Sequence, residues 1–366
     1  MDARPTDNRQ TIHHCMLHGL QTGVFPGAVL WVALGGREYF HRAYGVIDGF
    51  SREPVSAATL FDLASLTKPL ATTLAMMHLV GQGRIALDMP LGRLMPEFED
   101  RPPGKATVEQ LLRHQGGWAA YLPLYKTLKA ETADARRREL RGRLAAMEPV
   151  YPPGRQTLYS DLGFMVLDWV VERWAGQALD GLVADHYYSP LKIADLYFPG
   201  LGHPVSRQRF AATEDCPWRR RVLQGEVHDE NAFAVGGVAG HAGLFGTARA
   251  VGRLLKEISA AWRGPTARGI FHGPLVRRFL NHPAPLKRPL GFDCPAVRDS
   301  SAGRHFGSDS VGHLGFTGTS FWMDLERDVT VVLLTNRVHP RRSNQRIRRF
   351  RPVLHDCIME ALGGFG

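Results

Sequence analysis

The sequence lacks the features that mark membrane and disulfide-stabilised proteins. No apolar run approaches the roughly 18 to 20 residues that a helix needs to cross a bilayer, and the first residues show no charged-then-apolar targeting pattern. Only four cysteines occur among 366 residues, and none of them forms a CxxC pair. Neither a disulfide framework nor a cysteine-based zinc site is therefore expected. The composition predicts a cytoplasmic protein with reduced thiols.

Several widespread catalytic and cofactor motifs are also missing. The chain contains no GxSxG nucleophile elbow, no HExxH zinc motif and no glycine-rich phosphate loop. We therefore expect no metal and no cofactor. Any catalysis should come from the side chains and backbone of the protein itself.

Positive charge is in excess, which raises the question of a nucleic-acid partner. The formal net charge is +10, and short arginine-rich stretches occur at residues 136–138, 219–221 and 341–351. No zinc-finger spacing and no aromatic-glycine RNA signature accompanies them. We interpret these stretches as solvated faces of helices and loops, and we expect neither nucleic acid nor a membrane as a partner.

Strand-like runs occur at both ends of the chain, and helical patterns fill the middle. "GAVLWVALGG" and "REYFHRAYG" lie near the start, whereas "VGHLGFTG", "SFWMDLE" and "DVTVVLLTNR" lie near the end. Runs this short cannot bury a face alone, so they should join into one sheet. The predicted fold class is α+β, with a sheet domain formed by residues 1–62 and 300–366. Residues 63–299 should form a mostly helical lobe, with the active site between the two.

A serine and a lysine stand three residues apart at the start of the apolar stretch 64–91, which we predict to be a loop followed by a long helix. Residues i and i+3 lie on the same side of a helix, so Ser65 and Lys68 should touch. Pro69 is tolerated only in a first helical turn. The helix should therefore begin near Ser65, whose backbone N–H is then free to hold an oxyanion.

The SxxK pattern alone is weak evidence for catalysis. Ser65 could be only a helix cap and Lys68 only a solvated residue of the first turn. A second copy of the pattern occurs at residues 189–192, which we interpret as a capping turn. Other residues must therefore decide whether either copy is catalytic.

Two further short motifs supply candidates. Tyr159 and Asp161 flank a serine just before an apolar helix, so a phenol and a carboxylate can point into one cleft. His313 and Gly315 lie on a strand-like run, where a glycine lets a ligand approach the backbone closely. In the simplest alternative, Asp161 caps the helix and His313 is an ordinary strand histidine.

Together these residues resemble the serine beta-lactamase and penicillin-binding protein superfamily, in the branch of class C beta-lactamases, D-aminopeptidases and related esterases. Counterparts of the family boxes SxxK, Tyr-x-Asn and Lys- or His-x-Gly follow in this order at residues 65–68, 159–161 and 313–315. "LLRHQGGW" (111–118) and "GGVAGHAGLFGTA" (236–248) are also similar to the family. The resemblance covers about residues 22–355 and implies an antiparallel sheet flanked by terminal helices, beside a helical lobe.

The resemblance also implies roles for individual residues. Ser65 would attack a carbonyl and become acylated, while the backbone N–H groups of Ser65 and Phe316 would form the oxyanion hole. Either Lys68 or Tyr159 would accept the serine proton, and the choice stays open because the two should titrate as a coupled pair.

A further set of residues is expected at the substrate. The substrate-binding candidates are Asp161, His313, Gly315, Gln115 and His241. The glycine-rich stretch that carries His241 also contains three polar residues that could line the cleft: His228, Asp229 and Glu230.

Two departures from the family pattern change the expected chemistry. Asp161 replaces the usual asparagine, and an ionised carboxylate only accepts hydrogen bonds. It should also keep Lys68 charged, which moves the role of base toward Tyr159. His313 replaces the common lysine and is mostly neutral at pH 7, so it anchors a carboxylate less firmly.

These departures favour a serine hydrolase that cleaves a small ester or a peptide- or muropeptide-like amide through an acyl-enzyme. One alternative is a true beta-lactamase or D,D-carboxypeptidase. Another is a non-catalytic family member that binds a muropeptide or a protein partner, with Asp161 and His313 as signs of lost activity. The oligomeric state cannot be inferred from the sequence.

Overall fold

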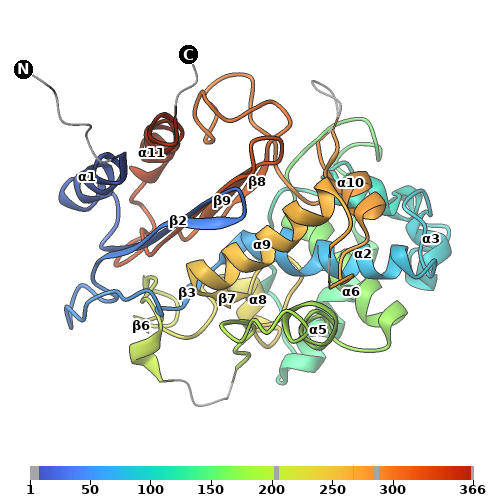
Figure 1. Ribbon diagram of the computed structural model, residues 1–366. Helices are drawn as coiled ribbons and strands as arrows, with labels where there is room; N and C mark the ends of the chain where they lie inside the picture. Colours follow the sequence, from blue (N-terminus) through green and yellow to red (C-terminus); the bar gives the residue numbers. More distant parts are fainter. Residues whose placement is uncertain (1–7, 202–205, 267, 283–287, 364–366) are drawn as a thin grey trace, which may run out of the picture.

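A five-stranded antiparallel sheet joins the two ends of the chain (Figure 1). The computed structural model describes residues 8–201, 206–266, 268–282 and 288–363. The strand order is β2-β1-β10-β9-β8, and the central strands β1 and β10 come from opposite ends of the chain. The strands are β1 (Gly27–Leu34), β2 (Arg37–Gly45), β8 (Val311–Leu314), β9 (Ser320–Asp324) and β10 (Val329–Thr335). The predicted α+β class and the antiparallel sheet are confirmed.

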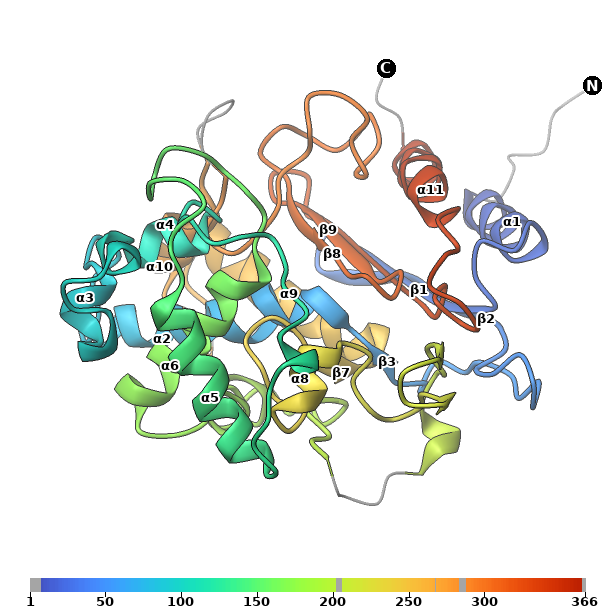
Figure 2. The ribbon, with the colours of Figure 1, turned by 180° about the vertical axis from the view of Figure 1, so that it is seen from behind.

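Both faces of the central strands β1 and β10 are buried, and successive side chains of a strand point to opposite faces. Helices α1 (Asn8–Gln21) and α11 (Ile347–Ala361) lie side by side over one face (Figures 1 and 2), and α9 (Ala248–Arg263) packs on the other. Alternate residues of β1 join the core beneath the terminal helices: Ala28, Leu30 and Val32. The residues between them join the main core: Val29, Trp31 and Ala33.

The middle of the chain is mostly helical, as expected. Besides α9, its described α-helices are α2 (Thr73–Gly81), α3 (Leu91–Leu94), α4 (Val108–Leu112), α5 (Ala133–Ala146), α6 (Asp161–Ala175), α7 (Leu179–Val183), α8 (Glu230–Ala234) and α10 (Gly273–Leu280). Short strands β3 (Phe61–Asp62), β7 (Phe245–Gly246) and β4 (Leu196–Tyr197) form one small sheet, and β5 (Asp215–Cys216) and β6 (Arg221–Val222) form another. The division into two domains near residues 62 and 300 stays a prediction.

The predicted long helix over 64–91 is wrong in its length and its regularity. A 3-10 turn (Ala64–Leu66) is followed by a π-helical turn (Lys68–Thr72) and then by α2, which ends at Gly81. Gly83 has a left-handed backbone (φ 69°), and such a glycine commonly terminates a helix. π turns within helices occur frequently at functional sites.

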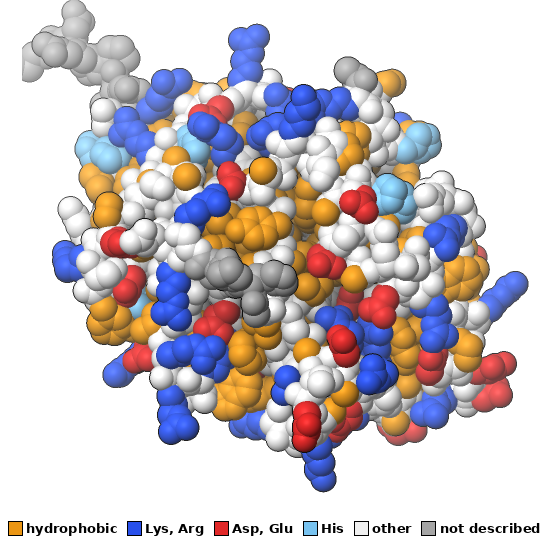
Figure 3. Space-filling model, turned by 90° about the horizontal axis from the view of Figure 1, so that it is seen from below, with side chains coloured by type: hydrophobic (Ala, Val, Ile, Leu, Met, Phe, Trp, Pro, Cys, Tyr) orange, Lys and Arg blue, Asp and Glu red, His pale blue; other side chains and the backbone are white. Residues whose placement is uncertain are grey.

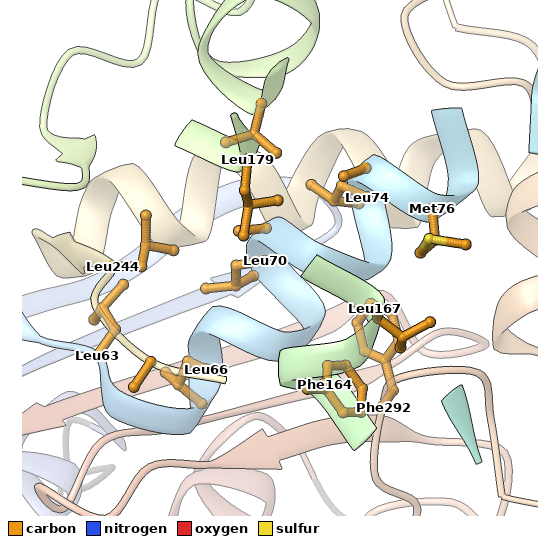
Figure 4. Packing of buried hydrophobic residues seen from close by; sticks show 14 of the residues in the cluster. Leu63, Leu66, Leu70, Leu74, Met76, Phe164, Leu167, Leu179, Leu244 and Phe292 are labelled. Carbon is orange, nitrogen blue, oxygen red and sulfur yellow. The ribbon is translucent and has the colours of Figure 1, made fainter. Parts of the chain in front are cut away.

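Apolar packing fixes where this irregular segment begins. Leu66, Leu70 and Leu74 are fully buried on it, and Figure 4 shows them following one another along the segment, with Leu63 next to Leu66. Because α2 and α6 share this core, the first turn of the segment is held against the start of α6. That junction brings residues 65–68 next to residues 159–161.

The interpretation of the arginine stretches as solvated faces is wrong for at least one arginine in each, and Arg351 in the last stretch is buried, where it donates to the Gly315 and Thr319 carbonyls. Arg137 and Arg219 each donate hydrogen bonds to two backbone carbonyls of the segment 227–238, and Arg342 forms ion pairs with two glutamates. Buried carbonyls outside regular sheets need such donors. On the face shown in Figure 3, the other basic side chains are scattered among acidic ones. Among the described helices, none has the length and apolar character required to cross a bilayer.

Candidate active site

Lys68 lies at the centre of a polar cluster at the start of the irregular helix. Its Nζ donates to Ser65 Oγ (3.2 Å), to Asp161 Oδ1 (2.6 Å) and to the His241 backbone carbonyl (3.2 Å). The Lys68 side chain is fully buried. An ammonium group has three donors and no acceptor, so these three oxygens satisfy it without water.

The start of α6 supplies the other two members of the cluster. Ser160, rather than Asp161, caps this helix, because Ser160 Oγ accepts the N–H of Gly163 (3.2 Å). Asp161 is therefore available to Lys68. The Tyr159 ring centre lies 4.9 Å from Lys68 Nζ, and its hydroxyl interacts with both Lys68 and Ser65. The ring of His114 packs on Tyr159 at 4.5 Å between centroids, which holds the phenol in place.

Neighbouring charges outweigh burial at Lys68, whereas burial outweighs the opposing charge of Lys68 at Tyr159. Burial would lower the pKa of Lys68, but Asp161 and Tyr159 outweigh it and raise that pKa. Burial raises the pKa of Tyr159, and although Lys68 opposes this, the net shift is upward. The resting site therefore holds an ammonium at Lys68 and a neutral phenol at Tyr159.

Ser65 opens onto a cavity of about 350 Å³. The lining comes from the SxxK turn, the start of α6, the loop before α8, the 241–242 turn and the segment after β8. The lining residues are Ala64, Ser65, Tyr121, Tyr159, Asp161, His228, Asp229, Glu230, His241, Ala242, Phe316 and Arg342. All four polar residues of the glycine-rich stretch therefore lie at this cavity.

The histidines of that stretch are engaged with carboxylates. His241 Nε2 lies 2.8 Å from Asp229 Oδ1, and His228 Nε2 lies 3.1 Å from Glu214 Oε2. His241 holds the pKa of Asp229 far below its usual range, although burial alone would raise it. Within the described residues, no group of three or more metal-ligating side chains is placed to hold a metal ion.

The two residues expected to form the oxyanion hole, Ser65 and Phe316, both lie at this cavity. Ser65 is the second residue of its 3-10 turn, where N–H groups have no partner inside the helix. Phe316 follows β8, and its ring stacks on His228 (5.5 Å between centroids). In the part of the chain that the structure describes, neither N–H donates to another protein group. Both residues line the cavity.

Three of the residues expected at the substrate, Gln115, His313 and Gly315, are not among the described residues that line this cavity. Gln115 Nε2 donates to Thr157 Oγ1 (3.0 Å). His313 lies behind Tyr159, with 6.0 Å between ring centroids, and burial holds its pKa well below the ordinary value. His313 is therefore neutral and supplies no positive charge to the site.

Gly315 has a steric role that can be tested. A Cβ on Gly315 would lie 2.0 Å from Thr319 Oγ1 and 2.7 Å from the Leu63 carbonyl. Such a contact pushes the end of β8 away from the turn that carries Ser65. We expect Gly315→Ala to lower the free energy of unfolding by roughly 1–3 kcal/mol, as overpacking commonly does. Urea denaturation measures this change.

Gly142→Ala is the matched control, because a Cβ on this helical glycine meets nothing within 4 Å. This substitution should leave stability unchanged or raise it by about 0.5–1 kcal/mol. Equal effects of the two substitutions would contradict the steric argument.

Sequence reasoning missed three residues of this region. Tyr121 and Arg342 line the cavity, and the guanidinium carbon of Arg288 lies 5.8 Å from the centre of the Tyr159 ring. Tyr121 follows the family-like stretch 111–118 closely, which is a weak signal. Arg342 is one of several arginines in the stretch 341–351, so the sequence does not single it out. No motif near Arg288 indicates a role at the site.

Comparisons with known proteins identify the family of the chain. A family model described as Beta-lactamase matches residues 12–354. The chain is 32% identical over 349 residues to an N-acetylmuramyl-L-alanine amidase of Bacillus subtilis (strain 168), covering 86% of this chain and 78% of the relative. It is 31% identical over 354 residues to a putative D-alanyl-D-alanine carboxypeptidase of Escherichia coli (strain K12), covering 86% and 79%.

Solved structures show the same fold. EstCE1, a hydrolase with promiscuous acyltransferase activity, superposes with a TM-score of 0.75 at 20% identity, covering 96% of this chain and 98% of that one. A D-alanine carboxypeptidase AmpC from Burkholderia cenocepacia superposes with a TM-score of 0.72 at 17% identity, covering 97% and 99%. The resemblance inferred from the three motifs is thus confirmed, and the chain belongs to the beta-lactamase family.

Proposed function

We propose that this protein is a serine hydrolase that cleaves the amide bond of a muropeptide-like substrate through an acyl-enzyme on Ser65. The observation that carries the proposal is the contact of Lys68 Nζ with both Ser65 Oγ and Asp161 Oδ1, with the Tyr159 phenol beside them. A serine hydroxyl is a weak nucleophile and needs an adjacent base. The cluster supplies one without any further group.

Tyr159 is the base in this proposal. The Asp161 carboxylate keeps Lys68 protonated, so Lys68 cannot accept the serine proton. The Lys68 ammonium instead stabilises the phenolate form of Tyr159, which interacts with Ser65. Tyr159 takes the proton from Ser65 Oγ as the oxygen attacks the substrate carbonyl.

The remaining steps use groups already in place. The oxyanion of the tetrahedral intermediate lies between the N–H groups of Ser65 and Phe316, both of which line the cavity. The Tyr159 hydroxyl donates its proton to the departing amine. It then takes a proton from the water that attacks the acyl-enzyme and returns this proton to Ser65 Oγ as the acyl group leaves.

The substrate class rests on two observations. His313 is neutral, so the position that carries a lysine in much of the family offers no cation for a substrate carboxylate. This argues against a peptide with a free C-terminus or a penicillin as the preferred substrate. The name of the Bacillus subtilis relative points to the amide between N-acetylmuramic acid and L-alanine.

A substrate panel tests this proposal. Purified protein is incubated with N-acetylmuramyl-L-alanyl-D-isoglutamine, a peptide ending in D-alanyl-D-alanine, p-nitrophenyl butyrate and nitrocefin. We expect release of the L-alanyl peptide with the highest kcat/KM, and slower ester cleavage. Preferential release of D-alanine would favour a carboxypeptidase, and preferential nitrocefin turnover a beta-lactamase; either result would overturn the proposal.

Asp161 should control the pH dependence of the reaction. Asp161 raises the pKa of both Lys68 and Tyr159, so its charge keeps protons on the cluster. Activity requires loss of one proton, and kcat/KM should therefore rise with pH into the alkaline range. In Asp161→Asn the negative charge is removed, both pKa values fall, and this rise should move to lower pH. Profiles of kcat/KM against pH for the two proteins measure the shift.

A structural control accompanies this variant. The amide of asparagine has nearly the shape of the carboxylate, so near-ultraviolet circular dichroism should be unchanged. A rise of kcat/KM that moves to higher pH, or does not move, would contradict the assigned effect of Asp161.

A further inference from the structure

Two arginines near the end of the chain are buried without a compensating negative charge. Arg337 follows β10 and is 4% exposed, and Arg351 lies on α11 and is 5% exposed. In the described part of the chain, neither forms an ion pair with a carboxylate, and the charges that act on them belong to other arginines. Burial lowers the pKa of Arg351 to about 9 and that of Arg337 to about 10, so both stay charged at neutral pH.

Burial of an unpaired charge is unfavourable. Removing a guanidinium group from water carries a solvation penalty, which a paired carboxylate normally offsets. The Nε–H of Arg337 and that of Arg351 are also buried, and neither has a hydrogen-bond partner among the described residues. Exceptions of this kind in a native fold are expected mainly at functional sites.

Both guanidinium groups donate to the turn that follows β8. Arg351 Nη2 donates to the carbonyls of Gly315 (3.3 Å) and Thr319 (2.7 Å). Arg337 Nη2 donates to the Phe316 carbonyl, and the guanidinium carbon of Arg337 lies 4.8 Å from the centre of the Phe316 ring. The two charges therefore converge on the turn that carries the Phe316 N–H.

The contact of Arg351 acts on the peptide group that is expected to supply the oxyanion hole. The Gly315 carbonyl and the Phe316 N–H belong to one trans peptide group, in which the two bonds point in opposite directions. The hydrogen bond from Arg351 therefore directs the Phe316 N–H away from α11. A hydrogen bond from a cation also polarises the peptide group, which makes its N–H a stronger donor.

The turn does not depend on Arg351 for its own hydrogen bonding. The Gly315 carbonyl also accepts the Gly318 N–H (3.1 Å), and the Thr319 carbonyl also accepts the Gly315 N–H (2.7 Å). Both carbonyls would therefore stay paired without the guanidinium group. The local contacts of Arg351 do not account for the burial of its charge.

We propose that Arg351 is a positioning residue of the hydrolase, which orients and polarises the Gly315–Phe316 peptide group so that its N–H stabilises the oxyanion. Arg337 supports the same turn through the next carbonyl, that of Phe316. Arg351 acts through the backbone and does not touch the substrate. The inference rests on the proposed function, because an oxyanion forms only if Ser65 attacks a carbonyl.

The test replaces Arg351 by methionine, which is also long and unbranched but carries no charge. We expect Arg351→Met to lower kcat about tenfold and to change KM by less than about twofold, because the oxyanion develops only after the substrate has bound. Loss of a direct donor commonly costs about 10²- to 10³-fold, and Arg351 acts through such a donor. The melting temperature should stay the same or rise, since a buried unpaired charge is removed. A lower melting temperature with unchanged kcat would make Arg351 purely structural and overturn the proposal.

The rate of labelling by a fluorophosphonate tests the same effect without the natural substrate. Phosphonylation of Ser65 also develops negative charge on an oxygen, so Arg351→Met should be labelled about tenfold more slowly than the wild type. Equal labelling rates would overturn the role of Arg351 alone. A wild type that is never labelled would overturn the proposed function and this inference with it, so the two failures are distinguishable.

Arg349→Met is the matched control, because Arg349 lies on the same helix but is exposed, and the substitution removes the same charge. Its kcat and labelling rate should equal those of the wild type. Arg351→Gln is a second neutral variant and should be at least about threefold slower than the wild type, which keeps the test decisive if Arg351→Met does not fold. An equal loss of activity in Arg349→Met, or full activity in Arg351→Gln, would overturn the inference.

Discussion

Ser65→Ala is expected to lower the hydrolytic rate by about 10⁴-fold or more and to abolish every covalent acyl adduct, because loss of a nucleophile removes the whole covalent route. Lys68 would keep its hydrogen bonds to Asp161 and to the His241 carbonyl. The buried ammonium therefore stays paired, and the fold should remain as stable as in the wild type. Stopped assays with the muramyl dipeptide give the rate, and intact mass with a fluorophosphonate gives the adduct.

The second SxxK copy offers a control within the same chain. Ser189 and Lys192 are both exposed, and the Lys192 N–H donates to the Ser189 carbonyl in a turn (2.9 Å). Neither side chain lines the cavity at Ser65. Ser189→Ala should therefore keep full activity and labelling. If the fluorophosphonate still labels Ser65→Ala, or never labels the wild type, the result would favour the alternative of a non-catalytic binding protein.

These two serines show which features of the site a local sequence pattern can predict. The i, i+3 spacing predicts contact within either pair, and a contact of Lys68 with Ser65 is present. What separates the two copies is burial, and burial depends on distant segments. Lys68 is covered because α6 and the 240–242 turn pack over it. The spacing of serine and lysine alone does not indicate which copy is buried. The order of the three family motifs does distinguish Ser65 from Ser189.

Other features depend on packing that no short motif encodes. Arg288 reaches Tyr159 from a position 129 residues later, and Arg342 reaches the cavity from within an arginine run. The π turn at residues 68–72 has an ordinary helical sequence, so an unbroken helix was the natural prediction. Gly83 does indicate the end of that helix in the sequence, because glycine adopts the left-handed backbone at little energetic cost.

Tyr159→Phe is expected to lower kcat by about 10²- to 10⁴-fold, the usual contribution of a general base. The phenyl ring can still pack on His114, so KM and stability should change little. Tyr121→Phe is the matched control, because Tyr121 also lines the cavity but is not among the described contacts of the Lys68 ammonium. Its kcat should change by less than about tenfold, since it takes no proton in the mechanism.

The pH profile of Tyr159→Phe decides between the two candidate bases. If Tyr159 accepts the serine proton, the alkaline rise of kcat/KM belongs to its phenol, whose pKa burial raises, and the residual activity of the variant should lose that rise. If Lys68 is the base, the rise persists in the variant, because the ammonium must still lose a proton. Because Asp161 raises the pKa of Lys68, loss of a proton from the Lys68 ammonium is unfavourable at neutral pH. A persistent alkaline rise in Tyr159→Phe that moves to lower pH when Asp161→Asn is added would therefore assign the proton transfer to Lys68 and leave Tyr159 as a donor to the leaving group.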